Sequence, residues 1–387
     1  MVDEHPHAER VHYGCPVNIA LQEEKQMKKW LLPAVFVLLV FVGGCGFKDI
    51  DNRFFVVTMG IDKSEEGGDL IKVSLKLAIP TADTRSDDSR FVVVTETSET
   101  ISEAIRIIKS RVDKELDFGH LKVILLGDQL TDASIKREMD WFYRRRDIQK
   151  IAWIAIGKPT AEEVMKIKPP SERLASNTLF LSFDLQGSES PYTISKYLFQ
   201  FYRESKSKGI SPVLPVVKVK NGLLEINQAD IFMNHKRVLR LSKNETKTFN
   251  ALKHEFEKQQ ITVKEKDKFF VVSIDNYKSD IKIAESGNEA AVEVGISVKG
   301  TIEESRSDLS EKELEVYNQL LEKEIERIVK DLLKKFQEKS LDPMGFGLAY
   351  RASHVEKDEW ERWNEIYPDI DIKVKADSKI MGTGIIE

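Results

Sequence analysis

The chain has 387 residues, of which 41% are hydrophobic and 32% are charged, and its formal net charge is −5. This near-neutral balance excludes the strongly basic footprint of a nucleic-acid-binding protein. Its only cysteines are Cys15 and Cys45, which excludes a disulfide-rich scaffold.

The first feature along the chain with a clear meaning is an export signal that ends at Cys45. The basic pair Lys28-Lys29 precedes an apolar run at 30–41, and Gly43-Gly44-Cys45 follows that run. A charged start, an apolar core of about 7–15 residues and small residues before the cut are typical of a secretory signal. A cysteine directly after the small residues predicts a lipoprotein signal peptide over 27–44 and a lipid on Cys45. The alternative, a transmembrane helix, needs an apolar run of about 20 residues.

Residues 1–26 do not suit the start of an export signal. They lack an apolar period and carry His5, His7, His12 and Cys15. Met27 directly precedes the basic pair, so we interpret 1–26 as a mis-assigned start. The alternative is a metal site built from these histidines and Cys15, but their spacing matches no standard site.

The mature chain is predicted to have an α/β (α+β) fold, with three successive domains that each combine a mixed or antiparallel sheet with packed helices. The N-terminal α/β domain is expected at 46–190. Its strands are expected at 54–61, 70–79, 91–95, 121–126 and 151–156, with helices after Thr100, at 132–145 and after Thr160. Thr100 and Thr160 each precede a glutamate by three residues, as in a capping box. The apolar run 121–126 indicates a central strand covered on both faces.

A middle domain is expected at 191–265, and a C-terminal α/β domain at 266–387. The middle domain has predicted helices at 193–205 and 244–256 and strands at 216–220, 223–226, 229–233 and 238–241. Asn221-Gly222 between two alternating runs predicts a hairpin. The C-terminal domain has predicted strands at 269–274, 278–284, 291–299 and 370–374, and short helices after 342 and at 358–366.

A long helix is expected to begin near residue 310. Its apolar residues recur every three or four positions: Leu314, Tyr317, Leu321, Ile325, Ile328, Leu332 and Phe336. We expect this stripe to pack across the helix's own sheet. The alternative is a coiled-coil face for a partner helix.

Motifs that would carry chemistry are missing. The sequence has no nucleophile elbow, phosphate-binding loop, zincin motif or cysteine pair, so we predict no catalytic, cofactor or metal site. His120 begins a buried strand and is either catalytic or simply hydrogen-bonded at the strand end. The run Arg144-Arg145-Arg146-Asp147 either binds anionic lipid headgroups or forms the polar end of a helix.

One further cluster stands out near the C-terminus. A turn from Asp342 through Gly345 precedes Trp360 and Trp363, which share one face of a helix. Glycine permits backbone shapes that other residues resist. The cluster is either a capped turn with aromatic packing or a docking surface for a partner, since tryptophan is enriched at interface hot spots.

Several segments, in this order and spacing, resemble the Ger(x)C family, the lipoprotein C subunits of spore germinant receptors. They are the lipobox at Cys45, 51–53 before 58–62, 120–124 with Gly127, 145–147 before 151–157, 241–242 with Glu245, 342–347, 360–368 and 382–384. The stretch 228–232 departs from the family pattern, and 1–26 have no counterpart.

The resemblance implies a non-enzymatic receptor subunit, anchored to the outer face of the spore's inner membrane by a palmitate-type lipid on Cys45. It would act with two integral-membrane partners, the A and B subunits, in nutrient-triggered spore germination. The alternative function is a lipid-anchored small-molecule (solute) binding protein. That function would need two similar lobes around a hinge, whereas the three expected units differ in element order. A cell-wall hydrolase would need a placed acid pair or metal set, and the sequence provides neither.

Overall fold

The computed structural model describes residues 52–78, 91–168, 177–184, 190–254, 259–265, 268–286, 289–306, 309, 311–354 and 359–382. The signal peptide, Cys45 and the segment 1–26 lie outside the described residues. Within the described part, the strands form two sheets, one from Arg53 to Leu241 and one from Gln259 to Ile380. The predicted mixed α/β class is confirmed.

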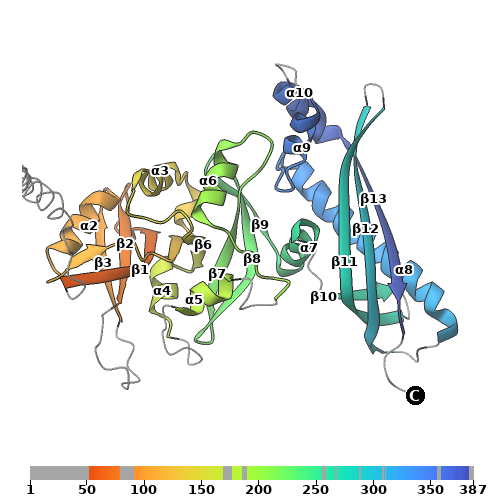
Figure 1. Cartoon of the computed structure of the whole chain (residues 1–387), viewed down its shortest axis with the longest axis horizontal. Coiled ribbons are helices and arrows are strands. Elements are labelled where there is room, and N and C mark those ends of the chain that lie inside the picture. Colours follow the sequence, from red (N-terminus) through yellow and green to blue (C-terminus); the bar gives the residue numbers. More distant parts are fainter. Residues whose placement is uncertain are drawn as a thin grey trace, which may run out of the picture. The chain divides into compact units, whose positions relative to one another are not determined.

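The first sheet has nine strands in the order β3-β2-β1-β5-β6-β7-β8-β9, with β4 beside the start of β1 (Figure 1). Its strands are β1 Arg53–Lys63, β2 Ile71–Ala78, β3 Phe91–Ser98, β4 Glu115–Asp117, β5 Val123–Gly127, β6 Trp153–Lys158, β7 Val213–Lys220, β8 Leu223–Met233 and β9 Lys236–Leu241. The parallel strands β1, β4, β5, β6 and β7 form its centre, and the antiparallel strands flank them.

Helices cover both faces of this sheet. One face packs against α2 Ile101–Lys109, α3 Lys136–Arg144 and α6 Leu198–Lys206, and the other against α4 Ala161–Lys166 and α5 Asn177–Phe183. All five residues of β5 are buried, as the apolar run predicted. A strand with apolar neighbours above and below has no side that favours polar residues.

The helix starts follow their predicted caps only in part. The Thr100 and Thr160 hydroxyl groups accept hydrogen bonds from the backbone N–H of Glu103 and Glu163, as expected. The carboxylate of Glu103, however, accepts a hydrogen bond from Ser98 Oγ. The helix predicted from 193 is wrong at its start: it begins at Leu198, because 194–197 run beside β6 and the Leu198 N–H donates to Ala152 O.

The Asn221-Gly222 hairpin is confirmed. Both residues have positive φ, 51° and 75°, and join β7 to β8. The two strands predicted at 223–226 and 229–233 are one continuous strand, β8, which absorbs a register shift opposite Val216 and Val217. The short strand β4 and helix α5 were not predicted, because neither has a clear apolar period.

The first sheet does not end at the expected domain boundary near residue 190. β6 pairs in parallel with β7, so strands on either side of that boundary belong to one sheet. β10, which lies at the end of the expected middle domain, pairs with β11 in the second sheet. The division into three domains therefore stays a prediction.

The second sheet has the order β10-β11-β12-β13. Its strands are β10 Gln259–Glu265, β11 Lys268–Ser286, β12 Glu289–Ser305 and β13 Asp371–Ile380. The two strands predicted at 269–274 and 278–284 are one strand, β11, with a register shift between Ile274 and Asn276. β13 closes the sheet in parallel with β12.

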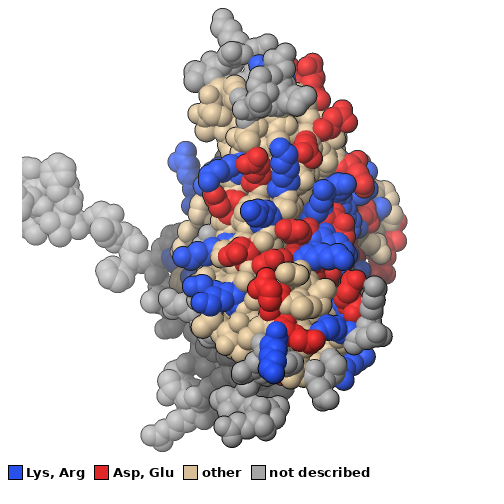
Figure 2. All heavy atoms as spheres, turned by 90° about the vertical axis from the view of Figure 1, so that its right-hand side faces the viewer, with Lys and Arg blue, Asp and Glu red and all other residues tan. Residues whose placement is uncertain are grey.

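One face of the second sheet is covered and the other is exposed. On β12, Val292, Val294, Ile296 and Val298 are buried, while Glu293, Gly295, Ser297 and Lys299 are exposed. The predicted alternation is confirmed. Figure 2 shows basic and acidic side chains interspersed over the side of the protein formed by the C-terminal elements.

The long helix α8 Leu314–Gln337 packs against its own sheet, as expected. It is shorter than the predicted helix, and Val329 joins its buried stripe while Ile328 is only partly buried. Three polar side chains on α8, four residues apart, accept hydrogen bonds from alternate N–H groups of β13. The acceptors are the side-chain oxygens of Glu326, Glu322 and Asn318. They accept from the N–H groups of Ala376, Ser378 and Ile380, respectively, at 2.8–3.0 Å. They satisfy donors on an edge strand that would otherwise be free to pair with another strand.

The remaining helices are α7 Lys243–His254, α9 Phe346–Ser353 and α10 Glu359–Ile366. α7 begins after Ser242, whose N–H donates to the carboxylate of Glu245. α9 and α10 follow α8 and lead into β13, so the predicted short helices are confirmed.

Candidate functional site

The turn before α9 is built around the carboxylate of Asp342. Its Oδ1 accepts hydrogen bonds from the N–H groups of Gly345 and Phe346 at 2.8 and 3.0 Å, and its Oδ2 accepts one from Gly347 at 2.7 Å. The Ser211 N–H donates to the carbonyl oxygen of Asp342 at 2.8 Å, and the Asp342 N–H donates to Ser211 Oγ at 2.9 Å. One carboxylate thus satisfies the N–H groups at the start of α9 and stands against the segment between α6 and β7.

Glycines allow this turn and that segment to approach each other closely. Gly345 has φ 83° and Gly209 has φ 90°, in the left-handed region that glycine tolerates. A Cβ on Gly209 would lie 2.6 Å from the Gly347 carbonyl carbon, and a Cβ on Gly347 would lie 2.7 Å from Trp363 Nε1. Neither position has room for a larger residue, so the backbone contact depends on both glycines.

The two tryptophans of α10 have different environments. Trp363 is 1% exposed and its ring lies between Tyr350 and Tyr367, with centroid separations of 5.1 and 5.2 Å. Trp360 is only partly buried and packs at the border of the same core. Trp363 is therefore a core residue, whereas Trp360 keeps an accessible surface.

A groove of about 460 Å³ lies above this turn. Its walls are the segment 204–212, the turn at 232–235 and α10, and Asp342, Trp360 and Trp363 contribute to its floor and rim. Glu204 lies in its wall but is paired with Lys196 at 2.6 Å. The groove brings together backbone atoms, aromatic edges and polar side chains, and two of its polar atoms, Glu204 Oε2 and His235 Nδ1, are buried without a hydrogen-bond partner among the described residues.

Burial changes the titration of Asp342. Burial raises its pKa to about 6, and the three backbone N–H groups and Lys253 oppose this rise. Lys253 Nζ donates to Met344 O at 2.9 Å, on the same turn. The raised pKa of Asp342 therefore comes from its burial in the turn that opens α9.

A second buried carboxylate, Asp62, lies in the first sheet and contacts other residues that carry the family resemblance. Asp62 lies near the end of β1 and accepts hydrogen bonds from the N–H groups of Ala161 and Glu162, at 2.7 and 3.0 Å, at the start of α4. Burial raises its pKa against these bonds. A Cβ on Gly127 would lie 2.1 Å from Asp62 Oδ1, and one on Gly157 would lie 2.7 Å from Ala161 Cα. These residues hold α4 against the sheet.

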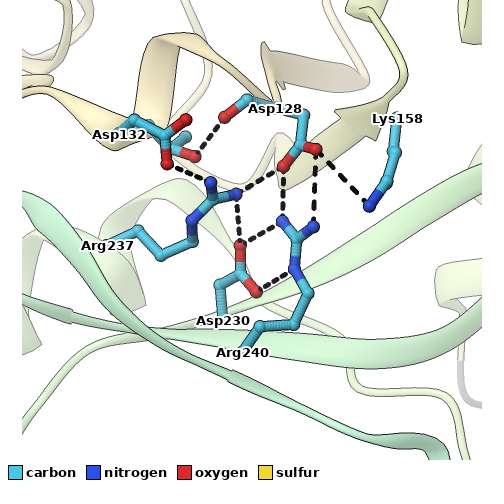
Figure 3. A network of polar contacts seen from close by, with 7 residues as sticks. Asp128, Asp132, Lys158, Asp230, Arg237 and Arg240 are labelled. Carbon is cyan, nitrogen blue, oxygen red and sulfur yellow. Dashed lines mark hydrogen bonds and ion pairs between the residues drawn. The ribbon is translucent and has the colours of Figure 1, made fainter.

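The third polar cluster joins the end of β5 to β8 and β9 (Figure 3). Asp230 on β8 is fully buried, and Arg240 binds it through Nε and Nη2 at 2.7 and 2.6 Å. Arg240 Nη2 also binds Asp128 at 2.5 Å, and Arg237 bridges Asp128, Asp132 and Asp230.

The charges in this cluster compensate one another. Burial alone would raise the pKa of Asp128, but hydrogen bonds from Arg240 and Arg237 outweigh it and hold the pKa below its usual value. The pKa of Arg240 is raised by its carboxylate partners, against the effect of burial. Because each charge has a partner of opposite sign, the cluster fixes the loop after β5 on the last strands of the sheet. The sequence signal was one acidic residue, Asp230, within an otherwise apolar strand end, and it was missed.

Two of the described histidines, His120 and His354, pack against aromatic rings. His120 has a 58% exposed side chain that lies edge-on against Phe55 and 3.7 Å from Asp117, so it is not inside the sheet. His354 stacks on Tyr350. No group of three His, Cys, Asp or Glu residues within the described part of the chain could hold a metal ion. Among the described helices, none is both long enough and apolar enough to span a membrane.

The structure thus brings together Asp342, Gly345 and Trp363, with Trp360 at the edge of the same cluster. Cys45 lies outside the described residues. Sequence reasoning missed Gly209, Ser211 and Lys253, which complete the turn from distant segments. Of these, only Gly209 is of a residue type that suggests a special backbone conformation. The reason for that conformation is its close approach to Gly347, which the sequence does not show.

Comparisons with known proteins show which family the chain resembles. The family described as "Spore germination protein N-terminal domain" matches residues 46–219, and "Spore germination B3/ GerAC like, C-terminal" matches 227–384. The chain is 24% identical to spore germination protein GerQC of Bacillus cereus over 370 residues, which cover 93% of this chain and 100% of the relative. It is 22% identical to spore germination protein KC of Bacillus subtilis (strain 168) over 403 residues, which cover 93% of this chain and 97% of the relative.

The fold has a solved counterpart. The crystal structure of the GerBC protein superposes with a TM-score of 0.56 at 20% identity, and the match covers 84% of this chain and 96% of that one. Two family matches that together extend from residue 46 to residue 384, and relatives that align over nearly their full length, agree with the resemblance seen in the sequence. The chain belongs to the Ger(x)C family of spore germination proteins.

Proposed function

We propose that this chain is the lipid-anchored, non-enzymatic C subunit of a spore germinant receptor. It acts with integral-membrane A and B subunits on the outer face of the spore's inner membrane, in nutrient-triggered germination. The observation that carries the proposal is the pair of family matches over 46–219 and 227–384.

The lipid anchor is supported by the position of Cys45. It follows Gly43-Gly44 at the end of an apolar run, and the first family match begins at the very next residue, 46. A mature protein that starts at Cys45 would contain the whole matched region and nothing before it. Two or three acyl chains bind a membrane far more firmly than one.

A non-enzymatic role is supported by what the buried carboxylates do. Asp62 and Asp342 each accept backbone N–H bonds at a helix start, and Asp230 is bound by Arg240. Burial of these three side chains would suit catalysis, and each of the three is instead committed to holding elements of the fold together. Contact with partners is the role that the described surface leaves open.

The lipid is tested by mass spectrometry of the protein extracted from spore membranes. We expect an acylated N-terminal Cys45 and no upstream residues. In the variant Cys45→Ala the protein should leave the membrane fraction. An unmodified chain that begins at Met1 would contradict both the anchor and the Met27 start.

The receptor role is tested by co-purification. Affinity capture of the chain from detergent-solubilised spore membranes should retain the A and B subunits, and deletion of its gene should abolish the response to the cognate nutrient while leaving other germination routes intact. Capture without A or B, in a chain shown to be lipidated, would refute the partnership while leaving the anchor standing. Heat release on adding nutrients to the chain alone would instead favour direct solute binding.

A further inference from the structure

The edge of the first sheet where β1 begins carries a concentration of basic side chains. β1, β4, β5 and β6 run parallel, so their amino ends lie at one edge of the sheet. The segments that lead into β4, β5 and β6, namely 109–114, 118–122 and 144–152, therefore share this edge with the start of β1. We call these three segments the amino edge.

Side-chain contacts tie the start of β1 and two segments of the amino edge together. Arg53, at the start of β1, pairs with Asp117 at 2.6 Å. Gln149 Nε2 donates to Gly119 O at 2.8 Å, and the Arg145 guanidinium lies 5.0 Å from the Phe118 ring centroid. The basic run 144–146 is thus fixed beside the 118–122 segment, at the same end of the sheet as Arg53.

The charge of the amino edge is strongly one-sided. Its basic residues are Lys109, Arg111, Lys114, Lys122, Arg144, Arg145, Arg146 and Lys150, and its acidic residues are Asp113 and Asp147. Arg111 pairs with Glu96 and Arg145 with Asp147. Arg144 and Arg146 are exposed and form no ion pair or hydrogen bond with any described residue. The whole chain, by contrast, has a net charge of −5.

An apolar side chain stands next to these charges. Ile151, five residues after Arg146, is 60% exposed. Its neighbour Lys150 donates to the carbonyl oxygens of Phe142 and Arg145, both at 2.7 Å, which holds the segment in place. Exposed arginines beside an exposed isoleucine match the composition of a surface that lies in the interface of a bilayer.

We propose that the amino edge docks on anionic phospholipid headgroups of the membrane that carries the Cys45 lipid. This inference rests on the lipid anchor proposed above. Arg53 is eight positions after Cys45, so even a fully extended chain keeps Arg53, at the amino edge, within about 28 Å of the anchor. Tethering at this range raises the effective concentration of the edge at the lipid surface. Each nearby Lys or Arg gains about 1 kcal/mol from an anionic surface, about fivefold in occupancy, and guanidinium groups match phosphate geometry.

The test uses the mature lipidated chain in vesicles. With Cys45 lipidated and Cys15 removed with the signal, Ile151→Cys provides the single reactive thiol for an environment-sensitive dye. Leu223→Cys is the matched control, because Leu223 is 52% exposed and follows the carboxyl end of β7, which runs parallel to β6. The dye at 151 should brighten and shift to the blue on phosphatidylglycerol-containing vesicles but not on phosphatidylcholine alone, and should revert in 1 M salt. The dye at 223 should not respond.

Charge reversal gives a second readout. Arg146→Glu changes two units of charge and should lower the docking constant about 25-fold. Lys63→Glu, at the opposite end of β1, should leave it unchanged, because Lys63 is exposed and equally free of ion pairs with described residues. Thermal melting of both variants checks that each remains folded.

The outcomes separate this inference from the anchor. A chain that washes off phosphatidylcholine vesicles refutes the lipid anchor. A chain that stays bound but gives equal dye signals at 151 and 223, or a signal independent of phosphatidylglycerol, refutes the docking of the amino edge. A response at 151 only when A and B subunits share the vesicle also overturns it and assigns the edge to a protein partner.

Discussion

The two sheets bury their cores in different ways. In the first sheet, helices cover both faces and β5 is buried along its whole length. In the second, α8 covers one face and β12 alternates between buried and exposed residues. A substitution on β5 therefore meets packed atoms in both directions, whereas half of β12 can change without touching the core. We therefore expect more substitutions to be tolerated in the strands of the second sheet than in the central strands of the first.

The sheets also differ in how they end. The first sheet ends at β3 and β9, and Arg237 and Arg240 of β9 are fixed by the cluster with Asp128. The second ends at β10 and β13, and three N–H groups of β13 donate to Asn318, Glu322 and Glu326 of α8. Since edge strands invite pairing with other chains, one helix both builds the core of the second sheet and protects its edge.

The variant with the largest expected effect tests whether the core on the covered face stabilises the second sheet. Trp363→Ala should lower the free energy of unfolding by about 3–5 kcal/mol, because it empties a fully buried site between Tyr350 and Tyr367. Trp360→Ala, on the same helix but only partly buried, should cost clearly less. Urea denaturation of both variants measures the difference. Equal losses would show that the two rings are equally important to the core.

Co-purification with the A and B subunits tests whether Trp360, unlike Trp363, contacts a partner. If Trp360 is a docking residue, Trp360→Ala should melt close to wild type while the A and B subunits no longer co-purify. Normal melting together with normal co-purification would show that Trp360 serves neither role.

The next effect compares a glycine in each sheet. Gly127→Ala on β5 should destabilise by about 3–4 kcal/mol, because its Cβ would lie 2.1 Å from Asp62 Oδ1 and displace the cap of α4. Gly295→Ala on β12 should be neutral or slightly stabilising, since the nearest atom to its Cβ is 3.8 Å away and alanine restricts the unfolded chain. Thermal melting distinguishes them. Similar melting temperatures would refute the contrast between covered and open faces.

The third prediction concerns pH. Since burial raises the pKa of Asp342 to about 6 from a reference of 3.8, the folded protein binds more protons than the unfolded one between these values. Asp342 therefore contributes stability below pH 4 that is lost as pH rises through 6, by at most about 3 kcal/mol. Asp342→Asn should flatten this slope in denaturation measured from pH 4 to 7. Asp369→Asn, at an exposed carboxyl nearby, should keep it. Parallel slopes in Asp342→Asn and wild type would contradict the assignment.

The smallest effect is at the edge of the second sheet. Glu322→Ala removes the acceptor for the Ser378 N–H and should cost about 1 kcal/mol. Glu315→Ala, at an exposed position of α8, is the control. Light scattering at high protein concentration should also rise in Glu322→Ala if the bond protects the edge. No change in either measurement would show that solvent replaces this acceptor without loss.

Much of the fold could be predicted from local patterns. The apolar run 121–126, the alternation along 291–299, the Asn221-Gly222 turn and the stripe on the long helix each reflect a period of side-chain burial, which is a local property of the chain. For the same reason the caps at Thr100 and Thr160 were predictable. The residues Asp342 and Trp363 stood out by type and spacing, but not the partners that fix them.

What the sequence by itself determined was therefore most of the strands and helices and the family resemblance, while the lipobox at Cys45 stays a prediction. Only the tertiary structure decided that β6 and β7 share a sheet across residue 190, that Gly209 and Ser211 complete the Asp342 turn, and that Arg237 and Arg240 bind Asp128. The physical reason is the distance in sequence between these partners. Each pair meets only when the sheets and helices are packed, and no local period of burial or charge records which distant residue will stand opposite.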